Sequence, residues 1–120
     1  MGVVDVIMLE RNKNLIVVIN GEIDQHNSEE IREKIDKAFE RSRCRHIIFD
    51  FSGVAFMDSS GIGLLIGRYK KVCSRDGTVA IANMNCDLGR IYNISGLKKI
   101  ISSFESLDQA EKQVDSRVHA

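Results

Sequence analysis

Two adjacent hydroxyl side chains, Ser59 and Ser60, stand where this sequence could best support chemistry. Asp58 precedes them, and Gly61 and Gly63 follow. An aspartate before an apolar helix can cap it by accepting a hydrogen bond from an otherwise unpaired N–H of the first turn. A phosphate on Ser59 would then meet free N–H donors and the positive end of the helix dipole. The stretch therefore predicts an exposed hydroxyl that could act as a phosphorylation switch.

A plainer interpretation is that Asp58 and Ser59 are ordinary capping residues, and spacing alone favours it. Three glycines in the following helical pattern, Gly61, Gly63 and Gly67, shift the balance. Each lowers helix propensity by about 1 kcal/mol relative to alanine. They predict that a strand or a partner protein approaches the first turns of this helix closely.

The serine pair does not match a hydrolase nucleophile. The elbow Gly-x-Ser-x-Gly needs a glycine two residues before the serine, where Met57 or Asp58 stands. Among the histidines, His46 opens an apolar strand, His119 is next to the last residue, and only His26 lies in a loop near a helix start. A single loop histidine is usually a solvated polar residue. The sequence therefore predicts a protein that is not an enzyme.

Neither a cofactor nor a metal is expected. Residues 58–63 lack the Walker lysine and the glycine spacing of a dinucleotide fold, and Arg68 lies too far along the helix to replace that lysine. A metal site built from Asp24, Asp58 and Asp87 is conceivable, but carboxylates this dispersed are more often caps and surface charges.

A second polar loop, residues 21–27, joins an apolar stretch to an amphipathic one. Its polar side chains include Glu22, Asp24, His26 and Asn27. In a parallel sheet, the strand ends that lead into helices share one edge, so this loop and the Ser59 stretch should lie side by side if their strands are neighbours. That would create a polar, acidic, exposed patch of the kind that binds partners.

The chain alternates strand and helix patterns. Strands are predicted at 3–9, 15–19, 46–51 and 78–82, with a hairpin turn at 11–14 between the first two and an edge strand at 100–104. Helices are predicted at 27–39, 59–74, 88–94 and from 107 onward. Asn27 with Glu30, and Ser106 with Gln109, form capping-box patterns, and Gly96 can take the left-handed conformation at a helix end. The order predicts an α/β fold with a mixed, mostly parallel sheet of four to five strands, opened by an N-terminal hairpin, and about four helices.

Composition limits the remaining possibilities. A chain of 120 residues with 43% apolar side chains fits a single domain, 1–120, with its core at about 3–115. Seventeen basic side chains balance seventeen acidic ones, so neither nucleic acid nor a membrane is expected as a partner. Cys44, Cys73 and Cys86 lack metal-ligand spacing and are expected to be reduced thiols. With no signal pattern and no apolar run near the ~20 residues that span a bilayer, a cytoplasmic location is expected.

Four motifs together resemble the anti-sigma factor antagonists of the STAS domain family. They are Gly21-Glu22-Ile23-Asp24, Phe56-Met57-Asp58-Ser59-Ser60-Gly61-Ile62-Gly63, Gly67-Arg68-Tyr69-Lys70 and Ile94-Ser95-Gly96-Leu97. The resemblance runs from about Leu15 to Phe104 and is greatest to the sporulation members of spore-forming bacteria. It implies the STAS fold, in agreement with the predicted order of strands and helices.

The resemblance also implies a partner-switching role in place of a simple cap. In this family, the unphosphorylated antagonist binds an anti-sigma factor that is also an ATP-dependent serine kinase, which frees a sigma factor for sporulation transcription. The kinase phosphorylates the serine after the motif aspartate, here Ser59, and the antagonist is released. A metal-dependent serine phosphatase of the 2C type restores the binding form.

Carried over residue by residue, the resemblance makes Ser59 the phosphoacceptor, with Asp58 and Asp24 supporting it and Ser60 a first-turn residue. The partner-binding residues it implies are Glu22, Asp24, His26, Asn27, Ser59, Gly61, Ile62 and Gly63. Related sequences often have a proline at 83–87, and this chain has none, so the share of that loop in the interface stays open. The free chain is expected to be a monomer. A general-stress antagonist and a STAS module that binds a small ligand remain alternatives.

Overall fold

An antiparallel hairpin opens a five-stranded sheet whose other neighbouring strands pair in parallel. The computed structural model describes the backbone of residues 3–118 and the side chains of residues 3–114. The strands, in their order across the sheet, are β1 (Asp5–Arg11), β2 (Asn14–Asn20), β3 (His46–Gly53), β4 (Val79–Ala82) and β5 (Ser102–Phe104). The predicted mixed sheet and its N-terminal hairpin are confirmed.

The hairpin closes through a two-residue turn that the sequence placed correctly. Asn12 and Lys13 both have positive φ, 53° and 68°, as a tight turn between twisted strands requires. The carbonyl of Lys13 accepts hydrogen bonds from the N–H groups of Arg45 (2.8 Å) and His46 (3.2 Å). The turn is therefore fixed to the start of β3, and β1 runs on to Arg11, two residues beyond the predicted end.

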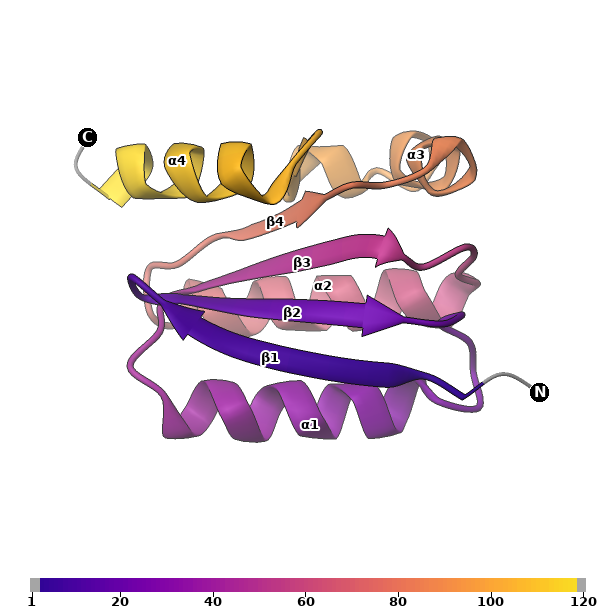
Figure 1. Cartoon of the computed structure of the whole chain (residues 1–120), viewed down its shortest axis with the longest axis horizontal. Helices are drawn as coiled ribbons and strands as arrows, with labels where there is room; N and C mark the ends of the chain where they lie inside the picture. The colour runs from indigo at the N-terminus through magenta and orange to yellow at the C-terminus, as the bar shows by residue number, and fades with distance from the viewer. Residues whose placement is uncertain (1–2, 119–120) are drawn as a thin grey trace.

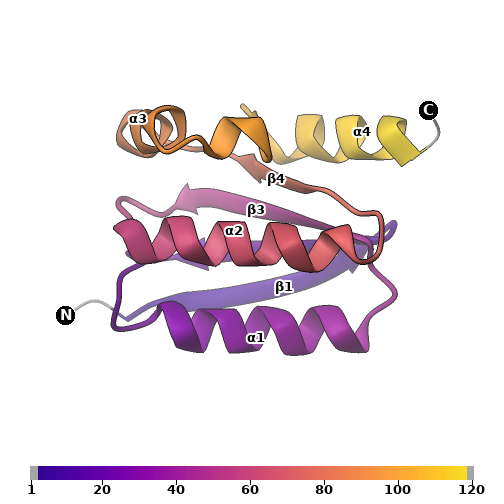
Figure 2. The ribbon, with the colours of Figure 1, turned by 180° about the vertical axis from the view of Figure 1, so that it is seen from behind.

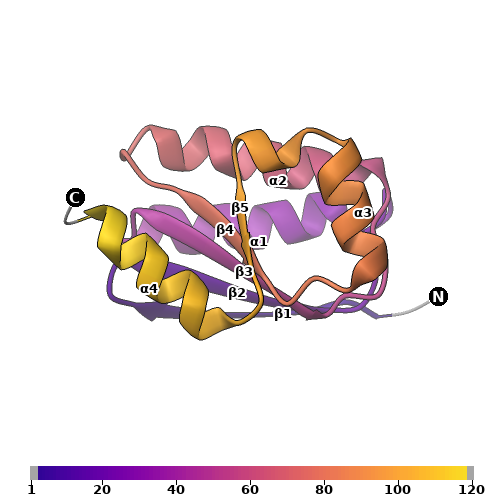
Figure 3. The same ribbon diagram turned by 90° about the horizontal axis from the view of Figure 1, so that it is seen from above.

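Helices cover the two faces of the sheet unequally. They are α1 (Ser28–Arg41), α2 (Ser59–Cys73), α3 (Cys86–Ile94) and α4 (Leu107–Val118), with a 3₁₀ turn, η1 (Leu97–Lys99), before β5. α1 and α2 lie together over one face (Figure 2), and α4 lies on the other side of the sheet (Figure 3). None of the described helices is long and apolar enough to cross a membrane.

The main core fills the space between the sheet and the α1/α2 layer. Alternate β2 residues, Leu15, Val17 and Ile19, are buried there, as the two-residue period of a strand requires. A smaller cluster on the other face joins Ile48, Ala80 and Ala82 to α4. α4 contacts β3, β4 and β5 and reaches the end of β1 through the ion pair of Glu111 with Arg11. Among the described elements, no helix is drawn in front of the middle of β1 and β2 on that face (Figure 1).

The expected capping box at Asn27 is wrong. The Asn27 side chain caps no helical N–H; its Oδ1 accepts from the N–H of Asp24 (3.0 Å) and its Nδ2 donates to the carbonyl of Glu22 (2.8 Å). An asparagine side chain can form hydrogen bonds to nearby backbone in turns as readily as in helix caps, and the Asn27 side chain bonds within the turn. By contrast, the predicted cap at Ser106 is confirmed, because its Oγ accepts from the N–H of Gln109 (3.2 Å).

Two smaller differences concern the last third of the chain. Gly96 is left-handed as predicted, with φ 85°. The α3 helix begins at Cys86, two residues before the predicted start, because Oδ1 of Asn85 accepts from the N–H of Leu88 (2.8 Å) and caps it. The edge strand begins two residues later than predicted, because the N–H groups of Ile100 and Ile101 bond back to the carbonyl of Leu97 in η1.

A buried ion pair joins α1 to α2. Nε of Arg68 lies 2.9 Å from Oδ1 of Asp36, and the two side chains are only 7% and 11% exposed. Arg32 and Lys71 approach the other carboxylate oxygen of Asp36, at 3.1 and 3.8 Å. Burial lowers the pKa of Arg68, and the negative charge of Asp36 opposes this shift.

Replacing Asp36 should lower the free energy of unfolding more than replacing Arg68. Asp36→Asn leaves Arg68 buried without its counter-charge and is expected to lower the free energy of unfolding by about 2–4 kcal/mol. Arg68→Met leaves Asp36 between Arg32 and Lys71, and should cost less than about 1.5 kcal/mol. Urea denaturation of both variants measures the difference; equal losses would contradict this account.

Candidate phosphorylation and partner-binding site

Two loops meet at the carboxyl ends of β2 and β3. The N–H of Ile23 donates to the carbonyl of Phe56, and the N–H of Asp58 donates to the carbonyl of Ile23, both at 3.1 Å. These bonds form an isolated parallel bridge between Ile23 and Met57, whose side chains are buried. The predicted contact between loop 21–27 and the Ser59 stretch is therefore confirmed, and it is made by the backbone.

Asp58 uses both carboxylate oxygens at this junction. Oδ1 accepts from the N–H of Ser60 (2.8 Å), which confirms the predicted N-cap of α2. Oδ2 accepts from the N–H of Gln25 (3.3 Å) in the other loop. One side chain thus fixes the start of α2 and its position relative to loop 21–27.

Ser59 is exposed as the first residue of α2, while Ser60 is half-buried. The first turn of α2 contains no acidic side chain. A negative charge placed on Ser59 would therefore lie at the positive end of the helix dipole. Of the two hydroxyls, that of Ser59 is the more accessible to another protein.

Asp24 has a structural role in its own loop. Its Oδ1 accepts from the N–H groups of His26 (2.9 Å) and Asn27 (3.1 Å), and the residue is half-buried, whereas Glu22 and His26 are exposed. The third carboxylate considered for a metal, Asp87, lies 3.6 Å from Arg90. Within the described part of the chain, no three potential metal ligands cluster.

The glycines of α2 face different surroundings. A Cβ on Gly61 would lie 2.8 Å from Cβ and Sδ of Met57, so the predicted close approach exists there and is made by a loop side chain. A Cβ on Gly63 or Gly67 would meet nothing within 4 Å. These two glycines line an open groove of about 280 Å³ between α1 and α2, together with Arg32.

The sequence of this chain matches the family described as "STAS domain" over residues 5–110. The chain belongs to the STAS domain family. The resemblance carried by the four motifs is therefore confirmed at the level of the family, and the five-stranded sheet with its α1/α2 layer is this family's fold as the chain adopts it.

Similar STAS proteins include named regulators. The chain is 35% identical over 101 residues to the "Anti-sigma F factor antagonist" of Paenibacillus polymyxa, covering 83% of this chain and 86% of the relative. It is 35% identical over 94 residues to the "Anti-sigma-B factor antagonist" of Bacillus subtilis (strain 168), covering 78% and 84%. The solved structure of the anti-sigma factor antagonist SpoIIAA in its unphosphorylated form matches with a TM-score of 0.81 and 26% identity, covering 93% of this chain and 97% of that chain.

One exposed residue of this STAS surface was missed as a candidate. Phe56 is 48% exposed beside the bridge, although its neighbour Met57 is buried. The residues around it, Val54, Ala55 and Met57, are apolar as well, so no sequence signal separates exposed Phe56 from buried Val54 and Met57. The loop is held from the other side by Asn85, whose Nδ2 donates to the carbonyl of Ala55 (3.1 Å). The segment without proline, 83–87, is thus anchored to the Ser59 stretch by a side chain.

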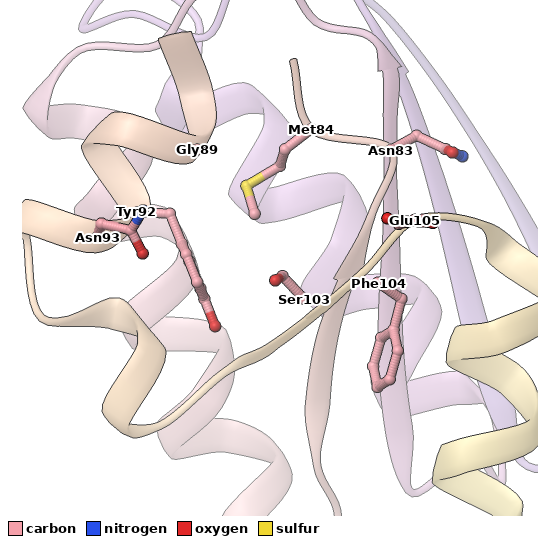
Figure 4. A pocket seen from close by; sticks show the side chains of 8 residues that line it. All are labelled: Asn83, Met84, Gly89, Tyr92, Asn93, Ser103, Phe104 and Glu105. Carbon is pink, nitrogen blue, oxygen red and sulfur yellow. The ribbon is translucent and has the colours of Figure 1, made fainter. Parts of the chain in front are cut away.

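A separate pocket of about 380 Å³ lies between α3 and β5 (Figure 4). Met84, Tyr92 and Ser103 point into it, whereas Asn83 turns away and donates to Asp50 (3.0 Å). Its lining contains Glu105 and, among the described residues, no lysine or arginine. Such a lining disfavours a phosphorylated small ligand, and the pocket includes no residue of the Ser59 junction.

Alanine at two neighbouring glycines should change the stability in opposite directions. Gly61→Ala forces the buried Met57 side chain aside and should lower the free energy of unfolding by about 1–3 kcal/mol. Gly63→Ala gains helix propensity in open space and should raise it by about 0.5–1 kcal/mol. Denaturant unfolding of the two variants, compared with the unmodified chain, checks both signs; stabilisation by Gly61→Ala would contradict the contact with Met57.

Proposed function

We propose that this chain is an anti-sigma factor antagonist whose partner binding is switched by phosphorylation of Ser59. The observation that carries the proposal is the exposed position of Ser59 at the start of α2. Beside it, Asp58 accepts from the N–H of Ser60 and from the N–H of Gln25 in the neighbouring loop. The names of its relatives, antagonists of anti-sigma F and anti-sigma-B factors, support the role. A solved relative described as unphosphorylated supports the modification.

In the proposed cycle, the unphosphorylated chain binds an anti-sigma factor that is also an ATP-dependent serine kinase, and the sigma factor is set free. Phosphorylation of Ser59 by that kinase releases the chain. A metal-dependent serine phosphatase of the 2C type returns it to the binding form. The chain itself acts as substrate and regulator, with no catalytic residue of its own.

Electrostatics explain why one phosphate would suffice. A serine hydroxyl can be covered by a partner at low cost, whereas a phosphate carries nearly two negative charges. At Ser59 that charge adds to the carboxylate of Asp58, which is adjacent in sequence, and to the acidic side chains of loop 21–27. If repulsion and desolvation remove about 3–4 kcal/mol, the affinity falls on the order of several hundredfold.

The surface proposed for the partner surrounds Ser59. It combines exposed Glu22 and His26 with exposed Phe56 and the face of α2 at Gly63 and Gly67. Two of the partner-binding residues expected from the motifs make contacts within the chain instead. Asn27 forms hydrogen bonds within its own loop, and Gly61 is buried under Met57. Phe56 adds an apolar anchor to a surface that the motifs alone describe as polar.

Phosphate mapping and binding measurements test the switch. After incubation with the sporulation-type anti-sigma kinase and ATP, mass spectrometry should find one phosphate, on Ser59. Ser59→Ala should keep its binding to the kinase, and Ser59→Asp should lose about tenfold or more, since one charge replaces nearly two. Ser60→Ala is the matched control and should remain a substrate. A phosphate on Ser60 alone, or equal binding by Ser59→Ala and Ser59→Asp, would contradict the proposal.

The chain is 35% identical both to an anti-sigma F factor antagonist and to an anti-sigma-B factor antagonist, which keeps a general-stress antagonist as the second candidate. Both candidates use the same serine chemistry, so the choice depends on the partner. The same assay with a general-stress anti-sigma kinase separates them: the cognate kinase is the one that both binds the unmodified chain and phosphorylates it.

The groove glycines should show their function through opposite effects on stability and binding. Gly63→Ala and Gly67→Ala should each stabilise the free chain but weaken binding to the anti-sigma factor about tenfold, because a methyl group prevents close approach. Gly89→Ala on α3 is the matched control, since a Cβ there also meets nothing within 4 Å. It should stabilise the chain and leave the affinity unchanged, as isothermal titration calorimetry can measure. Unchanged affinity in all three variants would remove these glycines from the interface.

A further inference from the structure

The outer edge of β1 is unpaired. β1 is the first strand in the sheet order and pairs with β2 over seven consecutive positions without a register shift. Its other side therefore presents alternating N–H and C=O groups that no strand of the described chain takes up. Natural sheets often protect such edges with proline or a bulge. The sequence contains no proline, and β1 runs without a bulge.

Apolar side chains accompany these unpaired groups. Val6 and Met8 pack against the main core, so the alternate residues Ile7 and Leu9 point to the opposite face. They are 53% and 47% exposed, on the face of the sheet opposite the α1/α2 layer, where α4 contacts β1 at its last residue, Arg11. An apolar stripe beside a free strand edge is typical of a surface that pairs with another strand.

We propose that this edge pairs with β1 of a second copy of the chain. The two β1 strands run antiparallel about a two-fold axis at Met8, which joins two five-stranded sheets into one. In this register Ile7 lies opposite Leu9 of the second copy, and Asp5 lies opposite Arg11 of the second copy. The strand is thus complementary to itself, with an apolar centre and a pair of opposite charges at each end.

The charges select this register among its neighbours. A slip by one residue would turn the apolar stripe of one copy to the wrong face. A slip by two residues would place Asp5 opposite Leu9, or Ile7 opposite Arg11, and would lose the charge pairs. Arg11 can serve two carboxylates, because Nε and Nη2 bond to Glu111 (3.0 and 2.6 Å) and its side chain stays 50% exposed.

This pairing revises the expectation of a free monomer and leaves the proposed switch accessible. Ser59 follows β3, and β2 lies between β3 and the pairing edge. A dimer formed through β1 would therefore present two Ser59 sites, one on each outer part of the joined sheet. The inference does not depend on the proposed function, since it concerns only the association of the chain with itself.

Sedimentation velocity of the full chain, from micromolar to millimolar concentration, tests the pairing. The unmodified chain should show a reversible, concentration-dependent dimer. Ile7→Lys should raise its dissociation constant about tenfold or more, because the change occurs twice in each dimer. Ile94→Lys on α3 is the matched control, since Ile94 is 79% exposed and lies outside β1. It should leave the dissociation constant unchanged.

Charge reversal tests the register. Asp5→Arg places arginine opposite Arg11 and should weaken the dimer, and the double variant Asp5→Arg/Arg11→Asp should strengthen it again relative to Asp5→Arg. Circular dichroism confirms that each variant is folded. A chain that stays monomeric at millimolar concentration, or a dimer weakened equally by Ile7→Lys and Ile94→Lys, overturns the proposal. Failure of the double variant to recover affinity overturns the register.

Discussion

The parallel pairing of β2 with β3 is the constraint on which the candidate site depends. The pairing has an irregular register between Val18 and Asn20, within β2. Beyond the strands it ends at the bridge of Ile23 with Met57. Gly53 leaves room for Asn20 on this path, because a Cβ there would lie 1.8 Å from Oδ1 of Asn20 and would displace that side chain. If the two strand ends separated, Asp58 could still cap α2, but it would lose the N–H of Gln25.

The distinction between local and non-local signals explains what the sequence could predict. Strand and helix periodicity, the Asn12-Lys13 turn and the Asp58 cap depend on residues within a few positions, and all are found as expected. The contacts of Asp58 with loop 21–27 and of Asn85 with Ala55 span 33 and 30 residues. They depend on which strands are neighbours in the sheet, and residues within a few positions of each other do not determine that order.

Asn27 shows that even a local signal can have two structural outcomes. Its side chain could bond to the start of α1 or to the preceding turn, and both arrangements use the same donors and acceptors. The carboxylate of Asp24 takes the N–H of Asn27 itself, so the turn closes on two side chains at once. The same closure keeps Asp24 half-buried in the loop. Only the three-dimensional arrangement separates a loop-forming carboxylate from an exposed one such as Glu22.

The α2 helix combines weak local propensity with strong anchoring. Gly61, Gly63 and Gly67 together cost about 3 kcal/mol of helix propensity relative to alanine, and only Gly61 has a packing reason within the chain. The helix is held by buried Leu64, Leu65 and Val72 and by the ion pair of Arg68 with α1. Because these residues lie on the buried side of α2, the side with Gly63 and Gly67 does not need side chains to hold the helix in place. The contacts within the chain give no reason for glycine at Gly63 and Gly67, whereas the proposed partner surface does, because a bare helix backbone lets another protein pack closely against it.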